Sequence, residues 1–128
     1  MTVEMRLKSK EDFETLCSKV PEVVSKNGFA VLAEIRTGDI LKSKGFDYGP
    51  LRTYEICNPA YAFRILSADE KFESLLPCRI VLKGKPEGIE VIGLLPEALS
   101  ELVDSTSVKD VAHEVQEKIK KIVGDIAK

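Results

Sequence analysis

The sequence predicts a single α+β domain over residues 1–128, with two layers, a largely antiparallel five-stranded sheet and helices on one face. Three observations lead to this prediction. The hydrophobic pattern switches between a period of two and a helical period. The later strands are joined by short, hairpin-like connections. The chain has 128 residues, of which 44% are hydrophobic and 31% charged, as in one compact domain. The expected order is strand, helix, four strands with a short helix inserted after the third, and a final helix.

The first strand and helix come from a change of period near the start of the chain. Residues 2–8 alternate between apolar and polar side chains, which predicts a strand. Ser9 is expected to cap a helix that runs to Lys26, because an acidic residue follows three positions later. Pro21 lies inside this helix and lacks an N–H, so we expect a kink or a break there. Asn27-Gly28 is expected to end the helix.

The second strand is expected over Phe29 to Arg36, with alternate residues on one face: Phe29, Val31, Ala33 and Ile35. The connection from Thr37 to Pro50 is long for a structureless loop. We expect an irregular segment with a short helical turn that packs on the body. The alternative is a flap over a cleft or a contact between two copies, because the segment carries large apolar side chains. These are Ile40, Leu41, Phe46 and Tyr48.

The third strand, Arg52 to Cys57, leads directly into a short helix. Asn58 can cap this helix and Pro59 suits its first position, so the helix should run through Ser67. Its inward face is expected to consist of Ala62, Phe63 and Leu66.

The fourth strand, Cys78 to Lys83, and the strand that follows it form a predicted hairpin. A five-residue loop over 84–88 would place Ile80 opposite Ile92, with a register uncertain by one or two residues. Another short helix is expected over 96–103.

Ser107 is expected to cap the last helix, whose apolar stripe is Val108, Val111, Val115, Ile119, Ile122 and Ile126. His113 is expected on its solvated face, paired loosely with Glu117. The lysines near the helix C-terminus offset the helix dipole and have no aromatic residues between them. Together with a net charge of -2, this argues against a nucleic-acid partner.

The composition indicates in which cellular compartment the protein is expected and which cofactors are not expected. No apolar stretch approaches the ~20 residues that cross a bilayer, and the opening residues do not resemble a secretory signal, so we expect a cytoplasmic protein. Three cysteines without a CxxC pair suit reduced thiols. With one histidine in the chain, a metal site is not expected, and no nucleotide-binding motif indicates a cofactor. The shortage of side-chain amides resembles heat-adapted proteins.

The main candidate site is Cys57-Asn58-Pro59, where a thiol precedes the cap of a helix. Unpaired N–H groups and the positive end of the helix dipole would lower the pKa of such a thiol and make it nucleophilic. In the alternative interpretation, Cys57 fills space at a strand end and Asn58 is an ordinary cap. Cys78 is the other candidate ligand-binding residue. Strand alternation places it on the core face and Cys57 on the opposite face, which argues against a disulfide or a shared metal. Cys17 is expected in the core.

Four motifs together resemble domain-of-unknown-function family 302, over about Glu11 to Val123: Cys57-Asn58-Pro59-Ala60, Leu76-Pro77-Cys78, Asn27-Gly28-Phe29 and Leu95-Pro96. The resemblance implies a two-layer α+β domain similar to the fold of the TATA-binding protein, and association as dimers. It implies no reaction, because the family name announces an unknown activity. The likeness to a DNA-binding fold carries no functional weight.

Our leading hypothesis is a dimeric, non-enzymatic cytosolic domain that binds a small ligand or a protein partner. The site would be bounded by Cys57-Asn58, the segment 37–50 and the start of the fourth strand. The rival hypothesis is an enzyme or carrier that uses Cys57 as a nucleophile in sulfur transfer or redox chemistry. A third is a purely structural subunit. The sequence alone leaves open whether the protein is an enzyme.

Overall fold

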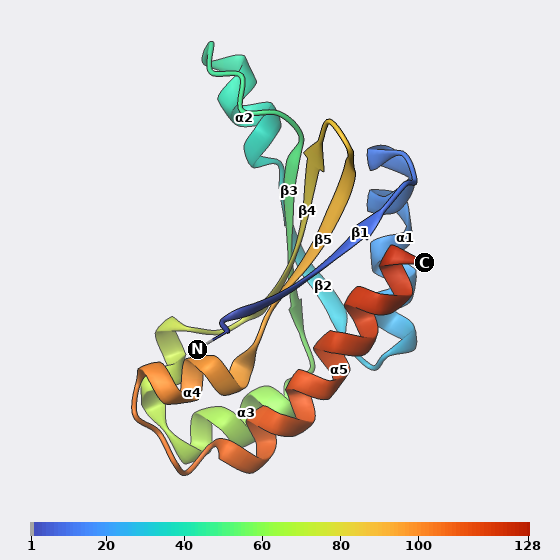
Figure 1. Ribbon diagram of the computed structural model, residues 1–128. Coiled ribbons are helices and arrows are strands. Elements are labelled where there is room, and N and C mark those ends of the chain that lie inside the picture. Colours follow the sequence, from blue (N-terminus) through green and yellow to red (C-terminus); the bar gives the residue numbers. More distant parts are fainter. Residues whose placement is uncertain (1) are drawn as a thin grey trace.

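The computed structural model describes residues 2–128, and Figure 1 shows a twisted sheet with two long helices along one side. All strand pairings are antiparallel, in the order β1-β5-β4-β3-β2. The strands are β1 (Glu4–Ser9), β2 (Ala30–Ile35), β3 (Leu51–Cys57), β4 (Cys78–Lys85) and β5 (Gly88–Leu94). The helices are α1 (Phe13–Lys26), α2 (Thr37–Ser43), α3 (Pro59–Ala68), α4 (Pro96–Leu102) and α5 (Lys109–Ala127), with a 3-10 turn, η1, at Glu70–Ser74. The predicted fold class is confirmed.

The core lies between the sheet and the helices α1 and α5. Both helices are amphipathic, and their apolar stripes face the sheet. Each fully buried aliphatic side chain contributes about 1.5–3 kcal/mol. The buried residues include Leu16, Cys17, Val20 and Val24 on α1, Val111, Val115, Ile119, Ile122, Val123 and Ile126 on α5, and Tyr54, Ile56, Ile80, Leu82 and Val91 on the strands. Cys17 is therefore in the core, as predicted.

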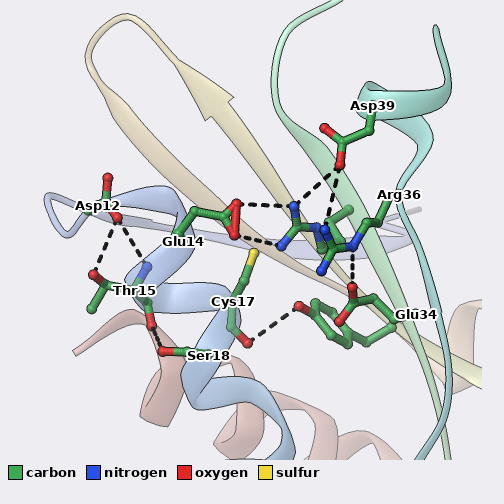
Figure 2. Close-up of polar contacts among 10 residues, drawn as sticks. Asp12, Glu14, Thr15, Cys17, Ser18, Glu34, Arg36 and Asp39 are labelled. Atoms are coloured by element: carbon green, nitrogen blue, oxygen red, sulfur yellow. Dashed lines mark hydrogen bonds and ion pairs between the residues drawn. The ribbon is translucent and has the colours of Figure 1, made fainter. Parts of the chain in front are cut away.

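Helix α1 begins later than predicted and does not break. Its cap is Asp12, whose carboxylate accepts a hydrogen bond from the N–H of Thr15 (Figure 2). Ser9 is the last residue of β1, so the predicted cap is wrong. The helix continues through Pro21, which lies on its exposed side.

Strand β2 contains a bulge that changes which side chains face the core. The register shifts between Val31 and Ala33. Phe29 is buried and Val31 packs against the core, but Ala33 and Ile35 pair with residues of the open face of the sheet. A bulge inserts one extra residue and so reverses the alternation beyond it. The predicted four-residue apolar face is therefore wrong after Val31.

The hairpin between β4 and β5 is tighter than predicted. Lys85 pairs with Gly88, which leaves a two-residue turn, and Ile80 lies opposite Gly93 rather than Ile92. This shift of one residue moves Ile92 to the other face of the sheet. A Cβ at Gly93 would lie 2.7 Å from methyl groups of Ile119 and Val123. Only glycine at this position allows α5 to lie so close to the sheet.

Segment 37–50 forms the regular helix α2 and a return segment, and Figure 1 shows them projecting beyond one end of the sheet. The expected short helical turn is present as α2 and its base contacts β3, but the rest of the segment projects from the body instead of packing on it. Gly38 lies against the backbone at the start of β3, where a Cβ would come within 2.5 Å of the carbonyl oxygen of Gly49. This close contact anchors the base of the segment, whereas Ile40, Phe46 and Tyr48 are exposed.

The remaining helices differ in detail from the prediction. On α3, Phe63 is 73% exposed and Ile65 is buried instead, so the inward face is rotated. Ser107 does not cap α5, because its hydroxyl donates to the carbonyl of Ala68. His113 contacts Glu97 of α4 through Nδ1 rather than pairing along its own helix. Within residues 2–128, no helix has the length and hydrophobicity needed to cross a membrane.

Candidate functional site

A pocket of about 230 Å³ opens at the end of the sheet where β3 finishes and β4 begins. Helix α3 covers one side and α5 contributes to the floor. None of the lining side chains is charged. They are Phe29, Ile56, Cys57, Asn58, Tyr61, Ala62, Ile65, Leu66, Leu76, Pro77, Cys78 and Val115.

Both candidate cysteines line this pocket. In the ladder, Cys78 pairs with Ile56 and Cys57 pairs with Ala30, so regular alternation would put the two thiols on opposite faces. The pocket lies at the end of the ladder, where β3 ends at Cys57 and β4 begins at Cys78. The ladder register thus agrees with the predicted opposite faces, although both residues line one pocket, and Cys17, Cys57 and Cys78 are free.

The side chain of Asn58 makes two hydrogen bonds at the edge of the pocket. Its Oδ1 accepts a hydrogen bond of 3.1 Å from the N–H of Tyr61, which confirms the predicted cap of α3. Its Nδ2 donates a hydrogen bond of 2.8 Å to the carbonyl of Gly28, in the turn between α1 and β2. Asn58 therefore fixes the start of α3 relative to a segment thirty residues earlier. Pro59 occupies the first helical position, is exposed and does not line the pocket.

The electrostatics of the pocket oppose the predicted thiolate. Burial raises the pKa of Cys57, and burial, followed by the neighbouring Cys57, raises the pKa of Cys78 to about 11. In the first turn of α3, the N–H of Tyr61 donates to Asn58 and Pro59 has no N–H, so neither is available to a thiolate. The expected lowering of the Cys57 pKa is therefore wrong. Both thiols are protonated at neutral pH.

Sequence reasoning missed the aromatic and aliphatic walls of the pocket. Phe29 and Tyr61 face each other with ring centroids 6.0 Å apart, and Val115 reaches the pocket from α5. Tyr61 and Ile65 lie one turn apart on α3, and this spacing could have identified the inward face. Phe29 and Val115 come from distant parts of the chain, and only the tertiary packing brings them here.

Segment 37–50 does not belong to this site. It joins β3 at Leu51, whereas the pocket lies at Cys57, so the two are separated by the length of the strand, about 20 Å. Figure 1 shows α2 and α3 at opposite ends of the sheet. The predicted region that included both is therefore wrong. Across residues 2–128, no three His, Cys, Asp or Glu side chains are grouped so that they could hold a metal ion.

Comparison with known proteins supports the fold and gives no activity. A solved structure, the crystal structure of an uncharacterized conserved DUF302 protein from Bacillus stearothermophilus, is similar with a TM-score of 0.92. The similarity covers 100% of both chains at 20% sequence identity, so it bears on the fold alone. No curated protein matches the sequence. The family model described as "Domain of unknown function DUF302" matches residues 5–126, and the chain therefore belongs to the DUF302 family.

Proposed function

We propose that this protein is a binding domain and that its pocket at Cys57, Asn58 and Cys78 takes a small, uncharged, largely apolar molecule. The observation that carries the proposal is the lining, which contains aromatic, aliphatic and thiol groups and no charged side chain. An ionic ligand would lose its hydration there without gaining a counter-charge. An apolar ligand gains free energy from every part of its surface that it buries.

The volume of the pocket limits the size of the ligand. A dry cavity of ~150 Å³ holds benzene, and pockets for drug-sized molecules begin near ~300 Å³. At about 230 Å³, the pocket suits one aromatic ring with a short substituent or a short branched chain. Asn58 donates one of its two amide N–H groups to Gly28, and the other can orient a polar atom of the ligand.

The test fills the pocket from α3 with a matched control on the same helix. Ala62 lines the pocket, whereas Ala60 is exposed and does not. Titration of the full chain with indole, followed by amide NMR shifts, should give saturable changes around Tyr61 and Leu76. Ala62→Leu should weaken indole binding by about tenfold or more, while Ala60→Leu should not change it. Equal binding by both variants, or shifts that map elsewhere, would reject the proposal.

The rival function is thiol chemistry at Cys57, as nucleophile in an enzyme or a sulfur or redox carrier. Its support is that Cys57 and Cys78 line one pocket. The raised pKa of each thiol stands against it, because the thiolate is the reactive form. Alkylation of each cysteine, measured by mass spectrometry as a function of pH, separates the two. Rapid alkylation of Cys57 below pH ~8 would favour the rival.

We also propose that the protein forms a homodimer through α2 and its return segment. The support is the exposure of Ile40, Phe46 and Tyr48, which lie on one projecting segment. A second copy of the chain would remove these side chains from water. Sedimentation of the wild type should show a dimer and Phe46→Glu a monomer, with Phe63→Glu, at an exposed residue of α3, as the control. A monomeric wild type at high micromolar concentration would reject this assembly.

The place of action is a further part of the proposal. Three unpaired thiols suit a reducing compartment, which supports a cytoplasmic location. The shortage of amide side chains supports a heat-adapted source. Thermal unfolding of the purified chain tests this second point, and a midpoint in the ordinary range of ~45–65 °C would contradict it.

A further inference from the structure

The Cys57 pocket opens beside an apolar strip of α3 that a ligand confined to the pocket would leave in water. Ala62 and Leu66 belong to the wall of the pocket, yet Leu66 is 37% exposed, so it is part of both the pocket and the outer surface. Phe63, on the same helix, is 73% exposed, more than any other large apolar side chain among residues 2–128. It does not line the pocket.

The period of the helix makes these side chains neighbours. At 3.6 residues per turn, Leu66 lies about 40° around the helix axis from Ala62, and Phe63 lies about 100° from Ala62 in the same direction. Tyr61 and Ile65, which also line the pocket, lie on the other side of Ala62. The apolar surface of α3 is therefore continuous from the pocket wall, past Leu66, to Phe63.

The small size of this strip favours a small molecule over a protein partner. A stable protein interface takes roughly 20–30 residues from each partner, whereas Leu66 and Phe63 are two side chains. A single alkyl chain that leaves the pocket would cover both of them. The far end of such a chain returns to solvent, so a polar group there keeps its hydration and loses nothing on binding.

We propose that the pocket binds a neutral amphiphile with an unbranched alkyl chain. The inner end of the chain fills the pocket, the outer methylene groups lie on Leu66 and Phe63, and the polar end remains in water. This inference rests on the proposed binding function of the pocket and adds the class of ligand. The pocket alone, at about 230 Å³, has room for only part of such a chain, and the strip provides contacts for the rest.

The test measures the affinity of the full chain for primary alcohols from 1-butanol to 1-nonanol, each below its solubility limit, by amide NMR shifts. If the pocket were the whole site, affinity would stop rising once the chain fills it. With the strip, each further methylene group should increase affinity by about twofold, which is half of the effect of complete burial in free energy. The shifts should also extend to the backbone amide of Phe63 for the longer alcohols.

A variant at the outer end of the strip has a matched control on another helix. Phe63→Ser should weaken the binding of 1-nonanol by about fivefold, because two or three methylene groups lose their contact. It should not affect 1-butanol, which is too short to reach residue 63. Leu102→Ser is the control, because Leu102 is 62% exposed on α4 and does not line the pocket.

Two kinds of failure are distinguishable with indole, the compact probe of the pocket. If indole does not bind, the proposed binding function is rejected, and the amphiphile with it. If indole binds but affinity levels off along the alcohol series, the pocket takes only compact molecules and the amphiphile is overturned. The same conclusion follows if Phe63→Ser leaves the affinity for 1-nonanol unchanged, or if Leu102→Ser lowers it equally.

Discussion

The hydroxyl group of Tyr54 donates a hydrogen bond of 3.3 Å to the carbonyl oxygen of Cys17. In an uninterrupted α-helix that carbonyl accepts from the N–H four residues later, but residue 21 is proline and has none. Tyr54 is 1% exposed, so its hydroxyl also needs a partner. The sheet thus supplies the donor that α1 lacks, and both buried groups are satisfied. Burial raises the pKa of Tyr54, which keeps the hydroxyl protonated as a donor.

This relationship predicts an energetic coupling between Tyr54 and Pro21. Tyr54→Phe removes the hydroxyl that donates to the Cys17 carbonyl, so this buried carbonyl is left without a donor. The free energy of unfolding should fall by about 1–3 kcal/mol. In a Pro21→Ala background the N–H of residue 21 can reach that carbonyl, so Tyr54→Phe should cost roughly 1 kcal/mol less. Urea unfolding of the wild type, both single variants and the double variant measures the coupling. If Tyr54→Phe lowers the free energy of unfolding by the same amount, within ~0.5 kcal/mol, in the wild type and in Pro21→Ala, the two sites are independent.

Replacement of glycine by alanine should have opposite effects on stability at Gly93 and at Gly124. A Cβ at Gly93 would lie 2.7 Å from Ile119 and Val123, so Gly93→Ala should overpack the core and cost about 1–3 kcal/mol. At Gly124, inside α5, a Cβ would meet nothing within 4 Å, so Gly124→Ala should stabilise the helix by up to about 1 kcal/mol. Midpoints of urea unfolding distinguish the two. Stabilisation by Gly93→Ala would mean that α5 can move away from the sheet without cost.

The parts of the fold that depend on local signals could be predicted from the sequence. The apolar stripe on α5 and the Asn58 cap of α3 depend on residues only three or four positions apart in the sequence, and both are present in the structure. The register of the β4–β5 hairpin could not be predicted, because it depends on the contact of Gly93 with Ile119, which lies 26 residues further along. The bulge in β2 has no local marker such as glycine or proline.

The sequence groups some, but not all, of the residues that line the pocket. Local motifs select Cys57, Asn58 and Cys78, which line one pocket, but they also select Pro59 and segment 37–50, which do not. The sequence favoured a thiolate because a helix begins beside Cys57. Burial reverses this expectation, and burial depends on side chains from other elements, such as Val115, that local reasoning does not reach.

Asn58 predicts two separable contributions to stability. Asn58→Ala removes both the cap of α3 and the link to Gly28, so it should cost about 1–2 kcal/mol for the cap alone and more for the link. Asn58→Asp keeps an oxygen that can accept from Tyr61 but loses the donor to Gly28, so its cost should be smaller. Thermal and urea unfolding of both variants measure the difference. If Asn58→Asp is as destabilising as Asn58→Ala, the link to Gly28 rather than the cap dominates.

The raised pKa of Cys78 predicts how stability changes in alkaline solution. In the unfolded chain the thiol loses its proton near pH ~8.5, whereas in the folded protein its pKa is about 11. Between these values the unfolded state binds fewer protons than the folded state, so the free energy of unfolding falls as the pH rises through this window. Below it, Cys78 contributes no pH dependence.

Urea unfolding at several pH values from about 7.5 to 10.5, in the wild type and in Cys78→Ala, tests this linkage. Cys78→Ala removes the titrating group, so its stability should fall less steeply over this range, whatever its stability at neutral pH. Cys17, Tyr54 and Cys57 also have raised pKa values and remain in both proteins, so the difference between the two curves reports the titration of Cys78 together with its coupling to Cys57. Parallel curves for the two proteins would mean that the Cys78 thiol ionises in the folded state as readily as in the unfolded chain, and that the pocket is open to water.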